Sequence, residues 1–146
     1  MAKQFKLQSV LNYRTTLEEQ AQQALALSQQ HHQELTAAVI AQQQELNEQD
    51  QVLKQRQEQG LTIAEIDIYE SRINHCRNRS AQLQRQLAIL EQKIAKQRET
   101  LLKAARDRQV MDKLKERQEA EFRREQERQE RIQLDEISLR NKGTRP

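Results

Sequence analysis

The chain has 146 residues, of which 35% are hydrophobic and 32% are charged, with no Trp and only two Phe, two Tyr, two Gly and one Pro. So few large apolar residues and turn formers argue against a globular core and against β-sheets. The net charge of +3 combines −2 over residues 1–60 with +5 over residues 61–146. Because bases and acids are interleaved and aromatic residues are scarce, we do not expect nucleic-acid binding.

The polar residues are mainly Gln, Glu, Arg and Lys, which all favour helix, so long helices are expected rather than disorder. The longest apolar run, residues 37–41, is too short to cross a bilayer. The N-terminus has no apolar stretch of the signal-peptide type. The sequence therefore predicts a cytoplasmic protein with no direct membrane insertion.

The first predicted helix covers about residues 7–59 and carries a weak apolar stripe at heptad-like spacing. A narrow stripe of this kind is typical of a helix that packs along a second helix. The stripe is predicted to consist of Val10, Leu17, Ala21, Ala24, Ser28, His31, Leu35, Ala38, Gln42, Leu46, Gln49 and Leu53.

The turn predicted at residues 58–62 is the one break in the helical pattern. Gly60 suits the left-handed conformation that closes a helix. Thr62 and Glu65 have the spacing of a capping box, and Leu61 and Ile66 stand at the positions of a hydrophobic staple. A short turn between two long helices makes them antiparallel neighbours.

The second predicted helix covers about residues 62–140, before a frayed tail at 141–146. Its stripe alternates by three and four residues without a break, and twelve of its seventeen positions are apolar. These positions form the predicted seam of this helix: Ile66, Tyr69, Ile73, Cys76, Ser80, Leu83, Leu87, Leu90, Ile94, Gln97, Leu101, Ala104, Arg108, Met111, Lys115, Gln118 and Phe122. Cys76, the single cysteine, is expected to be a small core residue rather than a reactive thiol.

Folding at Gly60 predicts an all-α, antiparallel two-helix coiled coil, a helical hairpin with the longer helix second, as a single domain over residues 1–146. Facing residues have numbers that sum to about 121, so Val10 is expected opposite Met111, Leu17 opposite Ala104 and His31 opposite Leu90. Residues after about 117 then have no partner in the chain. Apolar residues in this overhang indicate docking onto another molecule; they are Phe122, Ile132, Leu134, Ile137 and Leu139.

Catalytic chemistry is not expected. Two distant glycines cannot form a phosphate-binding loop, and the three His residues and Cys76 do not have metal-ligand spacing. Carboxylates alternate with bases on solvated faces, where no pocket tunes their pKa. We predict a non-enzymatic protein with no cofactor and no metal.

The two ends of the chain resemble the FliJ family of flagellar type III export proteins. The N-terminal pattern is Phe5-x-Leu7-x-x-Val10-Leu11-x-x-Arg14, followed by Glu18 and Ala21. The C-terminal half adds Asp107-Arg108, Leu114, Arg117-Gln118 and Leu134-Asp135-Glu136 before a short basic tail. The resemblance extends over nearly the whole chain.

The resemblance implies a stalk that binds the hexameric ring of the flagellar export ATPase, promotes its assembly and activity, contacts the export gate protein in the membrane and handles export chaperones. It implies a cytoplasmic protein peripheral to the inner membrane at the flagellar base. The residues implied in ring binding are Phe5, Leu7, Val10, Leu11, Arg14, Leu114, Arg117, Gln118, Asp135 and Glu136. Two alternatives remain open, the equivalent stalk of a virulence type III secretion system and a self-associating structural coiled coil.

Overall fold

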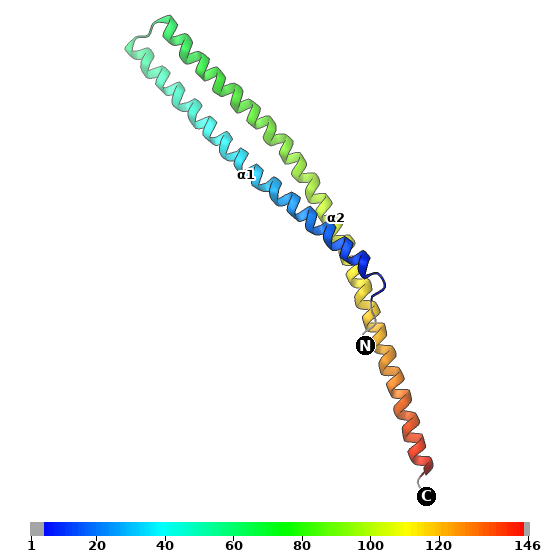
Figure 1. Ribbon diagram of the computed structural model, residues 1–146. Coiled ribbons are helices and arrows are strands. Elements are labelled where there is room, and N and C mark those ends of the chain that lie inside the picture. The colour runs from blue at the N-terminus through cyan, green and yellow to red at the C-terminus, as the bar shows by residue number, and fades with distance from the viewer. Residues whose placement is uncertain (1–4, 145–146) are drawn as a thin grey trace. The chain divides into compact units, whose positions relative to one another are not determined.

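The computed structural model describes residues 5–144, and these form two long helices. Helix α1 spans Gln8–Gln59, with 52 residues, and α2 spans Ile63–Thr144, with 82 residues (Figure 1). The helices pack against each other, and residues 5–144 contain no strand. The predicted fold class, an all-α helical hairpin with a longer second helix, is confirmed.

Contacts within the chain divide it into two compact units. The terminal unit joins the residues up to Gln20 to those from Leu101 onward, and the loop unit comprises Ala21–Thr100. In the loop unit the core is a cluster of Leu35, Leu83, Leu90 and Ile94, with Leu25, Ala38, Val39 and Leu87 packed against it. The assignment of the whole chain to a single domain stays a prediction.

The break between the helices lies at Gly60, as the sequence predicts. Gly60 has φ of 92°, a left-handed conformation that L-residues avoid because their Cβ meets the following carbonyl. Its N–H donates to the carbonyl of Gln57 at 3.3 Å. The backbone N–H of Glu65 donates to the Thr62 hydroxyl at 3.3 Å, which caps the first turn of α2.

Substitution of Gly60 therefore gives a first prediction. Nothing lies within 4 Å of the position that a Cβ would occupy, so Gly60→Ala costs conformational energy alone, about 1–2 kcal/mol in the free energy of unfolding. Gly60→Asn should cost less, because Asn adopts the left-handed region more readily. Urea denaturation followed by circular dichroism measures both, and an alanine variant as stable as the parent would contradict the turn geometry.

The heptad seam of α2 is confirmed by burial. All seventeen predicted positions from Ile66 to Phe122 are buried or half-buried, and most of the residues between them are exposed. Leu83, at 3% exposure, and Cys76, at 4%, are among the best-covered side chains. Burial raises the pKa of the Cys76 thiol, and the carboxylate of Glu45 raises it further. The thiol is therefore protonated and unreactive at neutral pH, as expected for a core residue.

The predicted seam of α1 is wrong at three positions. Leu11, Leu25 and His32 take the places expected for Val10, Ala24 and His31, which are exposed. The residues that face α2 repeat by three and four from Leu53 back to Leu11, and this alternation passes through charged residues at Glu18 and Arg14. At these positions the predicted stripe lies one residue too near the N-terminus. Residue type did not separate the two choices, because Val10 and Leu11 are both apolar and His31 and His32 are both histidines.

The end of α2 also differs from the prediction. The helix was expected to end near Arg140, but it continues to Thr144. Within the described residues Gly60 alone has a positive φ, so Gly143 stays helical and does not form a C-cap. Of the tail predicted to fray, residues 145–146 lie outside the part of the chain that the structure describes.

Candidate partner-binding site

The apolar core of the terminal unit is small. Phe5 and Leu11 pack around Met111 of α2, with 9%, 6% and 9% of their surfaces exposed. The N–H of Gln8 donates to the carbonyl of Phe5 at 3.0 Å, which fixes the entry into α1. The predicted contact of Val10 with Met111 is replaced by that of Leu11, because the seam lies one residue further along. Phe5 and Leu11 thus contribute to packing within the chain.

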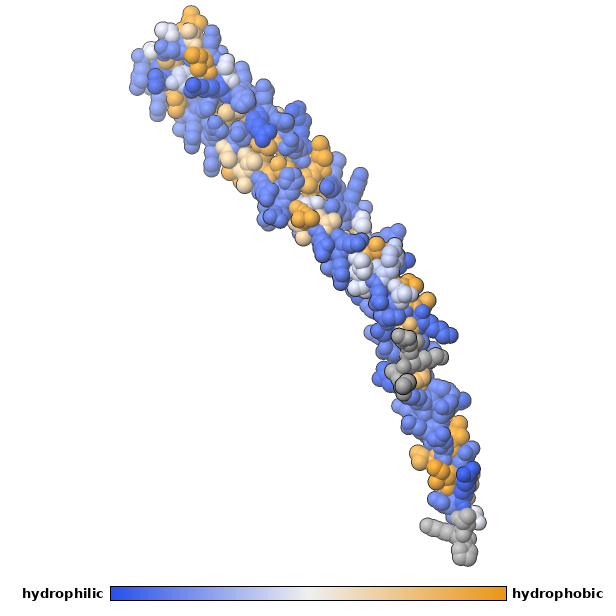
Figure 2. Space-filling view, viewed as in Figure 1, coloured by the Kyte–Doolittle hydropathy of each residue, from blue (hydrophilic) through white to orange (hydrophobic). Residues whose placement is uncertain are grey.

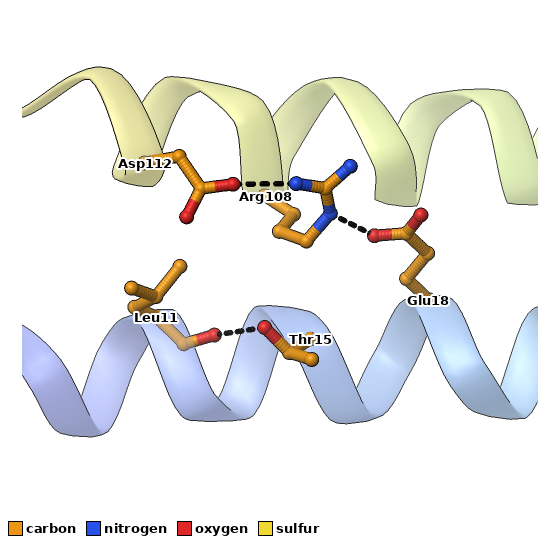
Figure 3. Close-up of polar contacts among 5 residues, drawn as sticks. All are labelled: Leu11, Thr15, Glu18, Arg108 and Asp112. Atoms are coloured by element: carbon orange, nitrogen blue, oxygen red, sulfur yellow. Dashed lines mark hydrogen bonds and ion pairs between the residues drawn. The ribbon is translucent and has the colours of Figure 1, made fainter.

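A charged layer lies next to this core, at seam positions that a coiled coil usually fills with apolar residues. Arg108 of α2 donates from Nε to Glu18 of α1 and from Nη1 to Asp112, one turn further along α2 (Figure 3). Glu18 is well covered, with 13% of its side chain exposed. Hydrogen bonds to Glu18, and then to Asp112, raise the pKa of Arg108, so its charge is permanent.

Arg14 belongs to the same face of α1 and forms a second ion pair with α2. Its Nη1 lies 3.4 Å from Oδ2 of Asp107, and the two side chains are 39% and 38% exposed. A pair so accessible to water contributes little to stability. Arg14 is therefore paired with α2 while more than a third of its side chain stays exposed to solvent.

Three of the apolar residues that the resemblance places at the partner surface are exposed beside this layer. Leu7 is 43% exposed, Val10 37% and Leu114 40%. Val10 directly precedes the seam residue Leu11, and Leu114 directly precedes the seam residue Lys115. In an antiparallel coiled coil, residues at these flanking positions lie along the same side of the helix pair. The side that carries Val10 and Leu114 also carries Asp107, seven residues before Leu114.

The last stretch of α2 presents apolar side chains to solvent. Residues 123–143 are all exposed, and Figure 2 shows hydrophobic patches among the hydrophilic surface near the C-terminus. The exposed fractions are 48% for Ile132, 65% for Leu134, 53% for Ile137 and 70% for Leu139. Asp135 and Glu136 lie within this stretch, while Arg117 is exposed and Gln118 half-buried further back on α2.

Sequence reasoning missed the roles of Glu18, Asp107 and Arg108. All three stand in the pattern that resembles the FliJ family, but only the structure joins them to Arg14 and Asp112 in three neighbouring ion pairs. The signal that would have found them is the strict three-four alternation of α1, which places Glu18 and Arg14 on the seam opposite the basic seam residue Arg108.

The other polar groups of the described residues were compared with the requirements of a metal site. Within residues 5–144 no group of three His, Cys, Asp or Glu side chains is arranged to hold a metal ion. In the loop unit His32 lies with Nε2 3.2 Å from Oε1 of Glu91. Neither described helix has an apolar stretch long enough to cross a bilayer.

The described residues form two long helices with a heptad core, a charged layer near the termini and exposed apolar residues around that layer. These features define a coiled-coil protein. The sequence profile of the family described as "Flagellar FliJ protein" matches residues 3–145. The chain therefore belongs to the FliJ family, a non-catalytic component of the flagellar type III export apparatus. No curated protein and no solved structure shows significant similarity to it.

Proposed function

We propose that this chain is the stalk that binds the hexameric ring of the flagellar export ATPase through its terminal unit. The observation that carries the proposal is the juxtaposition there of a partly exposed Arg14 with exposed Leu7, Val10 and Leu114. Arg is enriched at interfaces and among the residues that dominate binding energy, and the buried centre of an interface is more apolar than its rim. The exposed end of α2, residues 123–143, adds four exposed apolar side chains between Ile132 and Leu139.

In this proposal the bound stalk promotes assembly and activity of the ring. It also links the ring to the export gate protein in the membrane and handles export chaperones, and it is cytoplasmic and peripheral to the inner membrane. These roles rest on membership of the FliJ family. A match to a flagellar family favours this reading over the stalk of a virulence secretion system.

The exposed end of α2 suits a site that surrounds it. Ile132 and Leu139 are seven residues apart and share one face, whereas Leu134 and Ile137 lie near the opposite face at 100° per residue. A helix that docks into a single groove needs only one apolar stripe. Apolar residues on two faces are consistent with a helix enclosed on several sides, as in the lumen of a ring.

The test is steady-state ATP hydrolysis by the cognate export ATPase, with and without the protein, together with light scattering to follow ring formation. Stimulation accompanied by ring formation would support the proposal. A helical, unaggregated sample that neither binds nor stimulates the ATPase would refute it.

Arg14 gives a prediction that separates binding from stability. Arg14→Ala should raise the concentration needed for half-maximal stimulation roughly tenfold, the effect of losing a charge-assisted hydrogen bond to the partner. Asp107→Ala breaks the same internal ion pair but keeps the guanidinium, so it should leave stimulation close to that of the parent. Melting curves are recorded for both variants; equal losses of stimulation in the two would show that the internal pair, not the free guanidinium, matters.

A further inference from the structure

We infer that, when no ATPase is bound, the exposed end of α2 pairs with the same segment of a second copy of this chain, in an antiparallel arrangement. The occupant is identified by the charge pattern of the segment itself. The heptad seam of α2 continues past Phe122 at Glu125, Gln129, Ile132, Glu136 and Leu139. Of these, Ile132 and Leu139 are 48% and 70% exposed and provide an unpartnered apolar face.

The residues that directly precede every second seam position carry alternating charge. They are Glu121, Arg128, Asp135 and Lys142, seven residues apart, and all are exposed. In an antiparallel coiled coil these flanking residues of one helix face the same set on the other. The sequence acid, base, acid, base is complementary to its own reverse.

One alignment uses this complementarity. With Phe122 of one copy opposite Leu139 of the other, Arg128 meets Asp135 and Glu121 meets Lys142, and two-fold symmetry forms each pair twice. Sliding one copy by seven residues in one direction places Arg128 opposite Arg128, and sliding it in the other places Asp135 opposite Asp135. The charges therefore select a single register, because like charges in contact disfavour the others.

A parallel pairing forms fewer attractive contacts. The flanking residues would then face positions five residues further on, so that Glu121 meets Gln126, Arg128 meets Gln133 and Asp135 meets Arg140. Only the last of these contacts joins opposite charges, whereas the antiparallel arrangement joins two different pairs of opposite charges. The antiparallel arrangement is thus favoured by the same charges that fix its register.

The internal contacts of the segment do not oppose the pairing. Arg128 lies 3.2 Å from Glu125 on its own helix, but the two side chains are 70% and 52% exposed. A solvated ion pair of this kind is weak and exchanges readily for another partner. The seam does contain an unfavourable layer, in which Glu125 of one copy faces Glu136 of the other, and two-fold symmetry forms this layer twice. The dimer is therefore weak, with association in the micromolar range or above.

The test is sedimentation equilibrium of the full-length chain over a wide concentration range, without ATPase. The average mass should rise from monomer toward dimer. Arg128→Glu should weaken association roughly tenfold, since two attractive pairs become repulsive. The double variant Arg128→Glu, Asp135→Arg restores both pairs with exchanged charges and should restore association. Arg131→Glu makes the same charge change away from the interface and should have no effect.

Orientation is tested in a Cys76→Ser background with single cysteines placed at Glu121 or Lys142. Mixing the two variants should give a crosslinked heterodimer, whereas a chain with cysteine at position 142 alone should not crosslink to itself. The inference would be overturned if the parent stays monomeric at all concentrations or if the Arg128→Glu variant associates like the parent. It would also be overturned if the double variant stays monomeric or if the chain with cysteine at position 142 crosslinks to itself. None of these outcomes depends on the proposed function, because no ATPase is present.

Discussion

Leu83→Ala is expected to destabilise the protein by about 3 kcal/mol, the typical cost of truncating a well-buried leucine. Leu83 is 3% exposed and lies in the cluster with Leu35, Leu90 and Ile94. Only two helices line this core, and no third layer is available to close the cavity. Because the whole stability of a small domain is of order 10 kcal/mol, the melting temperature should fall on the order of 10 °C.

The matched control is Ile89→Ala. Ile89 lies six residues further along the same helix and is 68% exposed, so its truncation should change the free energy of unfolding by no more than about 0.5 kcal/mol. Thermal unfolding followed by circular dichroism at the helix band compares the two. Similar melting temperatures for both variants would show that the cluster around Leu83 is not the core of the loop unit.

Arg108→Glu is expected to give the largest electrostatic effect of any single substitution. It replaces the cation shared by Glu18 and Asp112 with a third carboxylate. Since Glu18 is only 13% exposed, water screens the new repulsion poorly. The N-terminal part of α1 should separate from α2, which hydrogen exchange detects as loss of amide protection in residues 8–20.

Two controls isolate this layer. Arg106→Glu makes the same charge change at an exposed position of α2 and should leave protection of residues 8–20 unchanged. Glu18→Arg combined with Arg108→Glu restores an opposite-charge pair across the helices and should recover much of the protection. Amide protection of residues 8–20 in the Arg108→Glu variant equal to that in the parent would show that these ion pairs do not hold the N-terminal part of α1 against α2.

The sequence predicted the helices well where apolar residues mark the seam. The three-four alternation of α2 was correct at all seventeen positions, and the turn at Gly60 was correct because several local signals agree there. Both could be predicted because the signals that mark them, the spacing of apolar residues and the turn residues, recur within a few residues along the chain. The fold class followed from these two features.

The candidate site was harder to predict, because its residues are polar and come from opposite ends of the chain. Glu18 and Arg108 occupy seam positions, but each alone looks like part of a solvated face. Their partnership depends on the register between the helices, and an error of one residue in α1 was enough to hide it. Residues such as Leu7 and Leu114 were named through the family resemblance, and the structure adds that they are exposed.

The ion pairs between the helices also bear on the order in which the chain folds. Sequence separation between paired residues grows from 59 for His32 and Glu91 to 90 for Glu18 and Arg108 and 93 for Arg14 and Asp107. Contacts near Gly60 close small loops at low entropic cost, whereas the terminal pairs close the longest loops. Folding should therefore proceed like a zipper from Gly60, with the termini the last to associate and the first to separate.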